Sequence, residues 1–339
     1  MNRILTLYKR LPPRSNLVKG RKYLSTLATT GLIVFGVPLG LYTYKCLMLI
    51  AFQNKLIYMG YLPPGSRHNQ DFKQQIPSSL NVQEEFINTV DNIRLHGFQV
   101  TKKQTVSADI TVRKKSDPIL IYFQGNAGNM ADRFELFKCI LTAIPNLTII
   151  GIAYRQYGNS EGYATEKGLQ KDAQAILDSV LAKCDPSAAV YLYGHSLGGA
   201  VAVDLMKNLI LHESKNNNKK KIDRIQGIII ENTFTSIYDM VNSLYPKYSP
   251  YPYIAKYCLW NHWCTDANLR YLPSTTRFLF LSSDNDEIVP SSHMRKLYSI
   301  ARYHPLHNAT LVRFKRSLHM DIYSKETKLF QTTLRDFIK

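Results

Sequence analysis

The sequence predicts an α/β protein whose mostly parallel sheet is covered by helices on both faces. Three observations support this prediction. The composition, with 45% hydrophobic and 20% charged residues, is that of a folded globular chain. Short, almost wholly apolar runs, typical of buried strands, recur along the chain, and longer amphipathic runs of helical period separate them. The 339 residues suffice for one large domain or two smaller ones.

The soluble part is expected to cover residues 56–339, beginning at Leu56. It starts with a β-hairpin over residues 85–90 and 93–100, because Asp91-Asn92 is a favourable turn pair. Buried strands are predicted at residues 118–123, 146–153, 188–193, 225–230, 277–281 and 310–314. Helices are predicted up to Leu141, at residues 167–183 and 199–211, and after the last strand. The polar, basic run at residues 215–221 predicts a solvated loop.

The net charge of +18 suggests a nucleic-acid binder only until it is located along the chain. Residues 1–67 hold ten Lys and Arg and no acid, so the remainder carries only +8. More than half of the excess therefore belongs to an N-terminal segment, and we expect no nucleic-acid partner. Five cysteines without a C-x-x-C pair predict neither a disulfide scaffold nor a zinc site.

Residues 23–44 carry no charge, a stretch long enough to cross a hydrocarbon core of about 30 Å as a helix. We expect a single transmembrane helix there, after a basic targeting or topology segment at residues 1–22. The positive-inside rule then places the N-terminus on the cytoplasmic or matrix side and the soluble part across the membrane. The first eleven residues are amphipathic, contain Arg and lack acids, like a mitochondrial targeting sequence. An endoplasmic reticulum or other secretory membrane is the alternative.

The pentapeptide Gly194-His-Ser-Leu-Gly198 has the form G-x-S-x-G. An apolar strand precedes it and a helix follows, which is the context of a sharp turn that projects a serine clear of the sheet. Glycines are needed because the backbone and its neighbours approach too closely for a Cβ atom. The pattern predicts Ser196 as a nucleophile.

A serine hydroxyl needs a histidine base and a carboxylate, in the chain order serine, acid, histidine for this turn. His319 comes five residues after the last predicted strand, where a loop at the carboxyl edge of the sheet would carry it. For the acid, Asp286 is preferred. Asp284 is expected to cap the turn instead, and Glu287 to be a solvated acid at a helix start.

The Gly-rich run at residues 125–129 follows the first central strand and predicts an oxyanion pocket. Its backbone N–H at Asn126 and that of Leu197 would supply two donors, each worth about 10²–10³ in rate. No phosphate-binding G-x-x-x-x-G-K-S/T motif is present. We therefore predict neither a cofactor nor a metal.

In this order and spacing, six segments make the chain resemble the α/β-hydrolases, specifically the membrane-anchored subgroup of fungal bud-emergence-like and animal α/β-hydrolase-domain proteins. They are residues 125–129, 154–162, 194–199, 231–234, 286–290 and His319. The resemblance places Ser196, Asp286 and His319 at the positions of the catalytic triad. It implies that Arg155, Tyr157 and Glu161 fix a loop. Gln124 replaces a histidine usual in the family, which implies altered hydrogen bonding in the pocket without loss of the reaction.

A cap is expected at residues 237–271, where aromatic side chains are far denser than the chain average of 11%. They would line an acyl pocket, meet the membrane interface, or only pack the cap on the sheet. Cys258 and Cys264 are either a disulfide or two thiols. The sequence thus predicts a membrane-anchored serine hydrolase of esterase, lipase or acyl-protein thioesterase type, acting on lipids or acylated proteins. The alternative is a catalytically silent membrane scaffold.

Overall fold

The computed structural model describes residues 23, 25–67, 72–103, 116–212, 218–273, 275–303 and 308–338. The chain divides into two units, Met1–Gln53 and Asn54–Lys339. The basic segment predicted at residues 1–22 lies outside the described residues, as do His68, His304 and His307.

The first unit contains a helix of 27 residues, Ser25–Ala51, which includes a π-helical turn at Leu32–Gly36 and the helix α2, Val37–Ala51. At 1.5 Å per residue it spans about 40 Å, and it is long and apolar enough to cross a bilayer. The helix continues seven residues beyond the predicted end at Tyr44, through Lys45. The uncharged stretch in the sequence indicates the apolar part of the helix. It does not indicate where the helix ends, because helical backbone hydrogen bonds continue past a charged residue.

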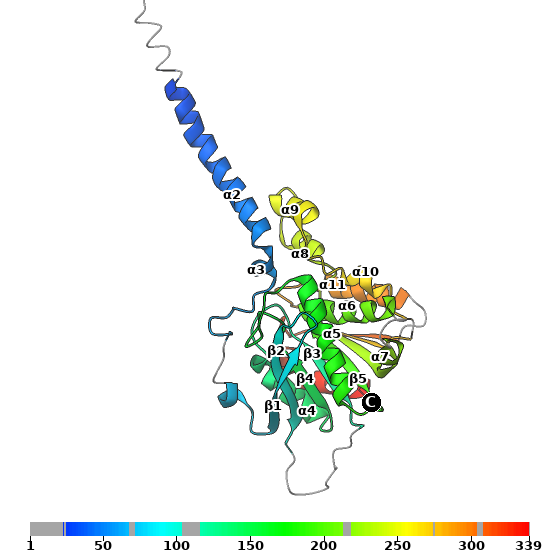
Figure 1. Ribbon diagram of the computed structural model, residues 1–339. Helices are drawn as coiled ribbons and strands as arrows, with labels where there is room; N and C mark the ends of the chain where they lie inside the picture. Colours follow the sequence, from blue (N-terminus) through cyan, green and yellow to red (C-terminus); the bar gives the residue numbers. More distant parts are fainter. Residues whose placement is uncertain are drawn as a thin grey trace, which may run out of the picture. The chain divides into compact units, whose positions relative to one another are not determined.

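The second unit is built on an eight-stranded sheet with the order β1-β2-β4-β3-β5-β6-β7-β8 (Figure 1). The strands are β1 Leu80–Asn88, β2 Arg94–Lys102, β3 Ile119–Phe123, β4 Thr148–Ile152, β5 Val190–His195, β6 Ile225–Glu231, β7 Phe278–Ser283 and β8 Ala309–Phe314. β2 runs antiparallel to β1 and β4, and every pair from β4 across to β8 is parallel. The predicted hairpin and mostly parallel sheet are confirmed.

Helices cover both faces of the sheet, as predicted. On one face α5, α6 and α11 pack against Ile121, Leu192 and Ile230, and on the other α4 and α13 pack against Tyr122 and Ile229. Neighbouring residues of a strand pack on opposite faces of the sheet, because side chains in a strand alternate with a period of two residues. The helices are α4 Phe134–Ala143, α5 Glu166–Lys183, α6 Leu197–Leu211, α7 Asn218–Arg224, α11 Ser292–Tyr303, α12 Ile322–Lys325 and α13 Thr327–Phe337. Shorter elements are α3 Gln53–Ile57, η3 Phe72–Gln75 and η4 Ala131–Arg133.

One predicted loop is partly wrong. Residues 215–221 were expected to be a solvated loop, but α7 begins at Asn218. Lys221 forms an ion pair with α5, in which its Nζ lies 2.7 Å from Asp178 Oδ1. The Lys-rich run therefore starts a short helix that leads into β6.

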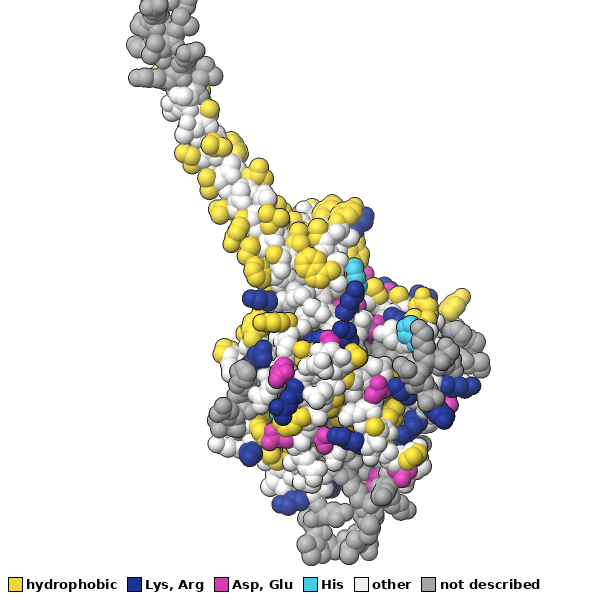
Figure 2. All heavy atoms as spheres, in the orientation of Figure 1, with side chains coloured by type: hydrophobic (Ala, Val, Ile, Leu, Met, Phe, Trp, Pro, Cys, Tyr) yellow, Lys and Arg dark blue, Asp and Glu magenta, His cyan; other side chains and the backbone are white. Residues whose placement is uncertain are grey.

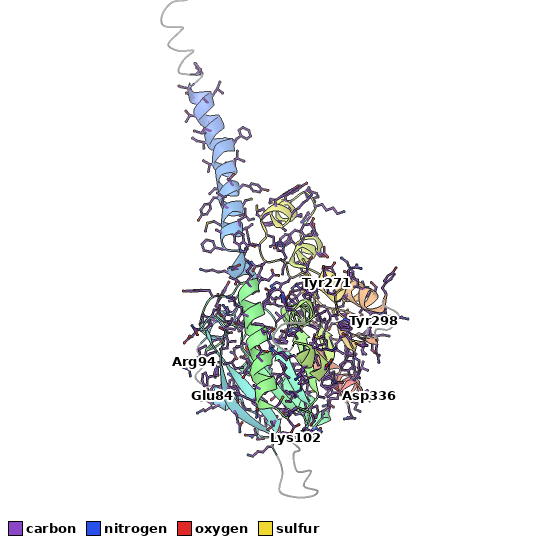
Figure 3. The ribbon with its side chains drawn as sticks, turned by 45° about the vertical axis from the view of Figure 1, so that its right-hand side comes forward. Glu84, Arg94, Lys102, Tyr271, Tyr298 and Asp336 are labelled. Atoms are coloured by element: carbon purple, nitrogen blue, oxygen red, sulfur yellow. The ribbon has the colours of Figure 1, made fainter. Side chains whose placement is uncertain are left out.

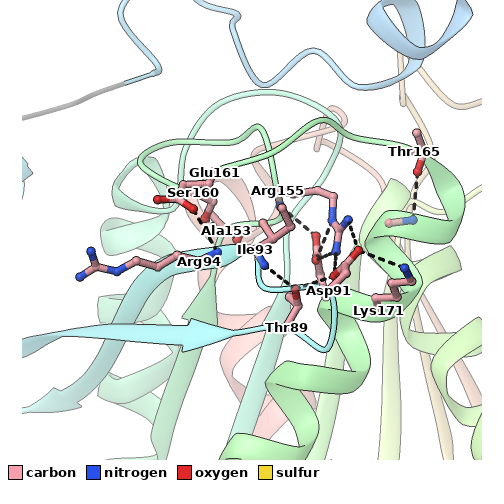
Figure 4. A network of polar contacts seen from close by, with 12 residues as sticks. Thr89, Asp91, Ile93, Arg94, Ala153, Arg155, Ser160, Glu161, Thr165 and Lys171 are labelled. Carbon is pink, nitrogen blue, oxygen red and sulfur yellow. Dashed lines mark hydrogen bonds and ion pairs between the residues drawn. The ribbon is translucent and has the colours of Figure 1, made fainter.

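The loop after β4 is fixed by a buried ion pair (Figure 4). The Arg155 guanidinium contacts Asp172 of α5 at 2.7 Å and Asp91 of the β1–β2 turn at 3.0 Å. Arg155 holds the pKa of the Asp91 carboxyl well below its usual range, chiefly through its hydrogen bonds. The pair ties the hairpin to α5 and positions the loop beside the carboxyl edge of the sheet.

A cap follows β6 and consists of α8 Ile237–Leu244, α9 Pro250–Cys258 and α10 Thr265–Leu269 (Figure 1). Its return segment is pinned to the domain. The Trp263 Nε1–H donates to Tyr58 Oη at 2.9 Å, and the Glu166 carboxylate accepts the backbone N–H groups of His262 and Trp263. Cys258 and Cys264 are thiols and not a disulfide.

Candidate active site

Ser196 occupies a strained turn between β5 and α6. Its backbone has φ 54° and ψ −118°, a conformation that a residue with a side chain rarely adopts. The turn is crowded, because a Cβ atom at Gly198 would lie 2.0 Å from the carbonyl oxygen of Phe123. Gly198 is therefore required by the close approach of β3. The sequence motif predicts this geometry correctly.

The end of β6 holds this turn in place. The Ser196 N–H donates to the Glu231 carbonyl oxygen at 2.8 Å, and Thr233 Oγ1 donates to the Ser196 carbonyl oxygen at 3.1 Å. The residue is 5% exposed. Strain at such a position persists only where the surroundings impose it, and these contacts supply the constraint.

Asp286 and His319 form a buried pair in the loops that follow β7 and β8. Asp286 Oδ2 lies 2.8 Å from His319 Nδ1, and both side chains are almost completely buried. The other carboxylate oxygen accepts the N–H groups of Ile288 at 2.9 Å and Val289 at 2.7 Å. Asp284 points elsewhere, because its carboxylate pairs with Arg313 at 2.9 Å.

The backbone of His319 is held from three sides. Its carbonyl oxygen accepts His195 Nε2–H and Asn232 Nδ2–H, each at 3.0 Å, and its N–H donates to Glu287 Oε2 at 2.9 Å. Glu287 is exposed, as the sequence suggested, but it does not stand at a helix start. Helix α11 begins only at Ser292, and the chain turns Glu287 back toward the loop after β8.

His195 connects Ser196 with His319. Its ring centre lies 4.8 Å from that of His319, and its Nε2 must carry the proton because a carbonyl oxygen only accepts. Burial lowers the pKa of His195 well below its usual value, so the ring is neutral. Because His195 precedes Ser196 at the end of β5, its side chain reaches the loop that carries His319 and helps to hold that loop in place.

The predicted oxyanion loop lies against the same turn. A Cβ atom at Gly125 would come within 3.5 Å of Ser196 Cβ, so the backbone before Asn126 passes directly beside the serine. The Asn126 carbonyl oxygen is fixed by Met59 N–H at 2.8 Å and Tyr157 Oη at 3.0 Å. Leu197 is the first residue of α6, whose first N–H groups have no partner within the helix.

Gln124, which stands where the family usually has histidine, is fully buried. Its side-chain oxygen and nitrogen have no hydrogen-bond partner among the described residues. The backbone is nevertheless held, because Tyr154 Oη donates to the Gln124 carbonyl oxygen at 3.2 Å. The loop backbone at this position is therefore held by a contact that does not involve the Gln124 side chain.

A buried carboxyl group, that of Glu231, lies at the end of β6, in the segment 231–234 that contributes to the family resemblance. Tyr193 Oη donates to Glu231 Oε2 at 2.5 Å. Burial raises the pKa of Glu231 to about 7. Glu231 and Tyr193 lie on the face of the sheet that also carries His195, two residues farther along β5. In the sequence, the feature that could indicate a buried carboxyl group is a glutamate at the end of an apolar strand. Its burial, however, depends on strands that are distant in the sequence.

A serine–histidine contact occurs at the cap. Ser243 Oγ lies 3.0 Å from His293 Nε2. The Ser243 hydroxyl donates to the Asp239 carbonyl oxygen at 2.8 Å, so its proton is already engaged with the backbone. His293 Nδ1 faces the Thr235 hydroxyl at 2.9 Å, whereas His319 Nδ1 faces a carboxylate.

A surface hollow is remote from these residues. Its volume is about 760 Å³, and it lies between the β1–β2 hairpin and α5, lined by residues such as Ile87, Lys171 and Asp178. Its lining includes neither Ser196 nor His319. It is a shallow groove on the side of the domain, whereas the strained serine and the Asp–His pair lie at the carboxyl edge of the sheet.

This sheet order, with a serine in a strained strand-to-helix turn and an Asp–His pair beyond later strands, defines an α/β-hydrolase. The chain is 30% identical over 321 residues to the alpha/beta hydrolase domain-containing protein WAV2 of Arabidopsis thaliana, covering 91% of this chain and 92% of that protein. It is 33% identical over 258 residues to the protein bem46 of Schizosaccharomyces pombe, covering 74% and 76%. The chain therefore belongs to the α/β-hydrolase domain-containing proteins, and the predicted resemblance is confirmed.

Two further relatives carry informative names. A membrane protein of Saccharomyces cerevisiae is 29% identical over 308 residues, covering 89% of this chain and 94% of that protein. The lysophosphatidylserine lipase ABHD12 of Gallus gallus is 29% identical over 201 residues, covering 55% of this chain and 48% of the lipase. No model of a protein family matches the chain.

Solved structures agree with the fold. A crystal structure of an α/β-hydrolase from Vibrio vulnificus has a TM-score of 0.60 and 16% identity, covering 83% of this chain and 92% of that one. At this identity the likeness concerns the fold alone. Support for a hydrolase comes from the relatives named above.

Proposed function

We propose that the protein is a membrane-anchored serine hydrolase that cleaves carboxylic ester or thioester bonds. The observation that carries the proposal is the buried Asp286–His319 pair, whose histidine ring lies 4.8 Å from that of His195, the residue next to Ser196. Asp286 faces Nδ1, which leaves Nε2 of His319 as the nitrogen that exchanges protons with Ser196. A hydrogen bond between Ser196 Oγ and His319 Nε2 is expected to form when substrate binds, because catalytic contacts are often made only in the complex with substrate.

The reaction proceeds in two halves. Ser196 Oγ attacks the carbonyl carbon while His319 Nε2 takes the hydroxyl proton, and the intermediate collapses when His319 protonates the leaving alcohol or thiol. Water then attacks the acyl-enzyme, again giving its proton to His319. The acid leaves and the proton returns to Ser196. Asp286 orients the imidazole and stabilises its positive charge throughout.

The negative oxygen of each intermediate is stabilised by the N–H groups of Asn126 and Leu197. Both belong to backbone segments in contact with the Ser196 turn, and one of them starts a helix, where the dipole favours negative charge. Such donors are fixed before the reaction and need no reorganisation. Because they are backbone groups, Gln124 does not affect their number.

The substrate class we propose is an acyl ester or thioester of a lipid or an acylated protein, with a medium or long chain. Two observations support it: a relative is named a lysophosphatidylserine lipase, and the cap is rich in Tyr and Trp. A charged or sugar-like substrate would need polar side chains converging from the cap, whose acids are Asp239 and Asp266. Both of these carboxylates pair with Lys296.

We also propose that Ser25–Ala51 spans the bilayer once, with the N-terminus on the cytoplasmic or matrix side. The seven cationic residues before the helix and the name of the yeast relative support this arrangement. A mitochondrial membrane is the proposed location, and an endoplasmic reticulum or secretory membrane is the alternative.

Hydrolysis of p-nitrophenyl esters by the full-length protein in detergent tests the proposal. Wild type should turn over these esters, and Ser196→Ala should lose at least about 10³-fold in kcat. Within the wild type, kcat/KM should rise from acetyl to octanoyl esters if an apolar acyl pocket exists. Equal rates for wild type and Ser196→Ala would favour a silent scaffold. A flat chain-length profile with active wild type would contradict only the acyl-chain preference.

A further inference from the structure

The cap exposes a group of large aromatic side chains that no described part of the protein covers. Four of them have at least half of their surface exposed to solvent: Tyr248 (91%), Tyr257 (73%), Tyr253 (59%) and Trp260 (50%). With Leu244, Tyr245, Lys247 and Lys256 they form what we call the cap surface. Figure 2 shows hydrophobic side chains gathered over α8 and α9, whereas charged side chains are scattered over the body of the domain.

A gathered group of exposed aromatic residues indicates a contact with something outside the domain. Contiguous apolar patches on soluble surfaces mark interaction sites, whereas isolated exposed apolar residues are ordinary. Tyr and Trp are the side chains that prefer the boundary between membrane and water, because each has an apolar body and a polar tip. The composition of the cap surface therefore fits a bilayer interface.

The charges of the cap surface have one sign. Between Met240 and Thr265 the sequence contains Lys247 and Lys256 and no Asp or Glu. Both lysines are exposed, and Lys256 Nζ lies 5.1 Å above the ring of Tyr257. Lysines beside interfacial aromatic residues are attracted to anionic headgroups, with about 1 kcal/mol for each charge near the surface.

The chain itself ties this surface to the end of the apolar helix. Trp260 Nε1–H and Asn261 Nδ2–H donate to Asn54 Oδ1 at 3.2 and 2.6 Å, all within the second unit. Asn54 follows Ala51, the last residue of the helix, by three residues, a distance of at most about 11 Å along an extended chain. Trp260 of the cap surface therefore contacts a residue that lies three positions after the last residue of the helix, and this holds for any direction of the helix.

We propose that the cap surface is a membrane-binding surface, which places its Tyr and Trp side chains in the interface of an anionic phospholipid bilayer. The aromatic bodies enter the headgroup region while Lys247 and Lys256 contact lipid phosphates. The contact fixes the orientation of the second unit on the membrane and does not depend on Ser196 or on any reaction.

The two tryptophans of the chain provide a selective test. Trp260 lies in the cap surface, whereas Trp263 is 1% exposed and donates to Tyr58. The full-length protein is reconstituted in phosphatidylcholine vesicles, with and without phosphatidylserine, in which the acyl chains are brominated. Brominated chains should quench wild-type emission, and Trp260→Phe should lose that quenching because only the shielded Trp263 remains. Unquenched wild-type emission, or equal quenching of both proteins, would overturn the proposal.

The charge is tested with a matched pair of double variants. Lys247→Glu with Lys256→Glu should lower the quenching in vesicles that contain phosphatidylserine. Lys102→Glu with Lys103→Glu should not, since Lys102 ends β2 at the edge of the sheet opposite the cap (Figure 3). Equal effects of the two variants would contradict a specific role for the cap lysines.

Two further outcomes distinguish membrane binding from self-association and from catalysis. If Trp260 emission shifts with protein concentration and bromine does not quench it, the surface binds a second copy of the chain and the proposal is wrong. Ser196→Ala should be quenched like wild type. Failure of the esterase test would therefore leave membrane binding standing, and failure of the quenching test would leave the reaction standing.

Discussion

Asp286 Oδ2 lies 2.8 Å from His319 Nδ1, although 33 residues separate the two in the sequence. Strands β7 and β8 are parallel neighbours, so the loops that follow them meet at the same edge of the sheet. The N–H groups of Ile288 and Val289 donate to Asp286 Oδ1, so Oδ2 is the oxygen that faces the histidine. The fold thus directs Nδ1 of His319 to the acid, and the proposed reaction uses Nε2 for proton transfer.

The two neighbouring aspartates provide a first prediction. Asp286→Asn should lower kcat for ester hydrolysis by about 10³–10⁴-fold, because an amide stabilises the wrong tautomer of the histidine. Asp284→Asn should stay within about threefold of wild type, since it removes only an exposed pair with Arg313, of the kind worth about 1 kcal/mol or less. Steady-state kinetics on the two purified variants decide the matter. A larger loss in Asp284→Asn would mean that the acid is misassigned.

The buried Glu231 carboxyl group makes stability depend on pH. Its pKa is raised by burial from 4.5 to about 7, so the folded state binds a proton that the unfolded state releases between those values. Stability from this group is therefore present at low pH and falls as pH rises toward 7, at about 1.4 kcal/mol for each unit of pKa difference.

Glu231→Gln should remove that dependence, because an amide cannot ionise. Thermal unfolding of the detergent-solubilised protein at pH 5.5 and pH 8 compares the two proteins. Relative to wild type, the Gln variant should gain stability on going from pH 5.5 to pH 8. A wild-type melting temperature that rises as much as that of the variant over this interval would argue that Glu231 is ionised in the folded protein.

The Arg155 ion pair gives a prediction on stability. Arg155→Met leaves Asp172, which is completely buried, without its partner and should destabilise the fold by about 3–5 kcal/mol. Lys171→Met removes an exposed pair with Asp91 and should cost about 1 kcal/mol or less. Denaturant unfolding of both variants measures the difference. Similar losses would indicate that burial of the Arg155 pair has little energetic importance.

Topology can be tested with tags at the two ends of the chain. The basic residues before the helix predict that an N-terminal tag lies on the cytoplasmic or matrix side and a C-terminal tag on the opposite side. Protease added to sealed membranes should therefore reach only one of them, and carbonate extraction should leave the protein in the pellet. Access to both tags from one side would exclude a single span.

Most of the fold could be predicted because its signals are local. Apolar strands and amphipathic helices follow from residue periodicity, and the G-x-S-x-G motif carries its own turn geometry. Even so, periodicity does not set exact ends: the apolar helix runs to Ala51 instead of Tyr44, and α7 begins inside the expected loop.

The contacts and the burial that the sequence did not predict depend on segments that are distant along the chain. Glu287 is exposed, as expected, but its hydrogen bond with the His319 N–H could not be predicted, because it requires the loops after β7 and β8 to lie side by side. Glu231 is buried only because neighbouring strands and their loops close over it. The motif does not reveal that His195 contacts the His319 carbonyl oxygen, because the two residues are 124 positions apart in the sequence.

The central claim is that Ser196 is the nucleophile, and covalent labelling with a fluorophosphonate probe in isolated membranes tests it most directly. Ser243→Ala is the matched control, since the Ser243 hydroxyl oxygen lies 3.0 Å from a histidine ring nitrogen, Nε2 of His293. Wild type and Ser243→Ala should label equally, whereas Ser196→Ala should not label and His319→Ala should label poorly. Labelling that persists in Ser196→Ala would contradict the assignment of the nucleophile, and its loss in Ser243→Ala would move the nucleophile to the cap.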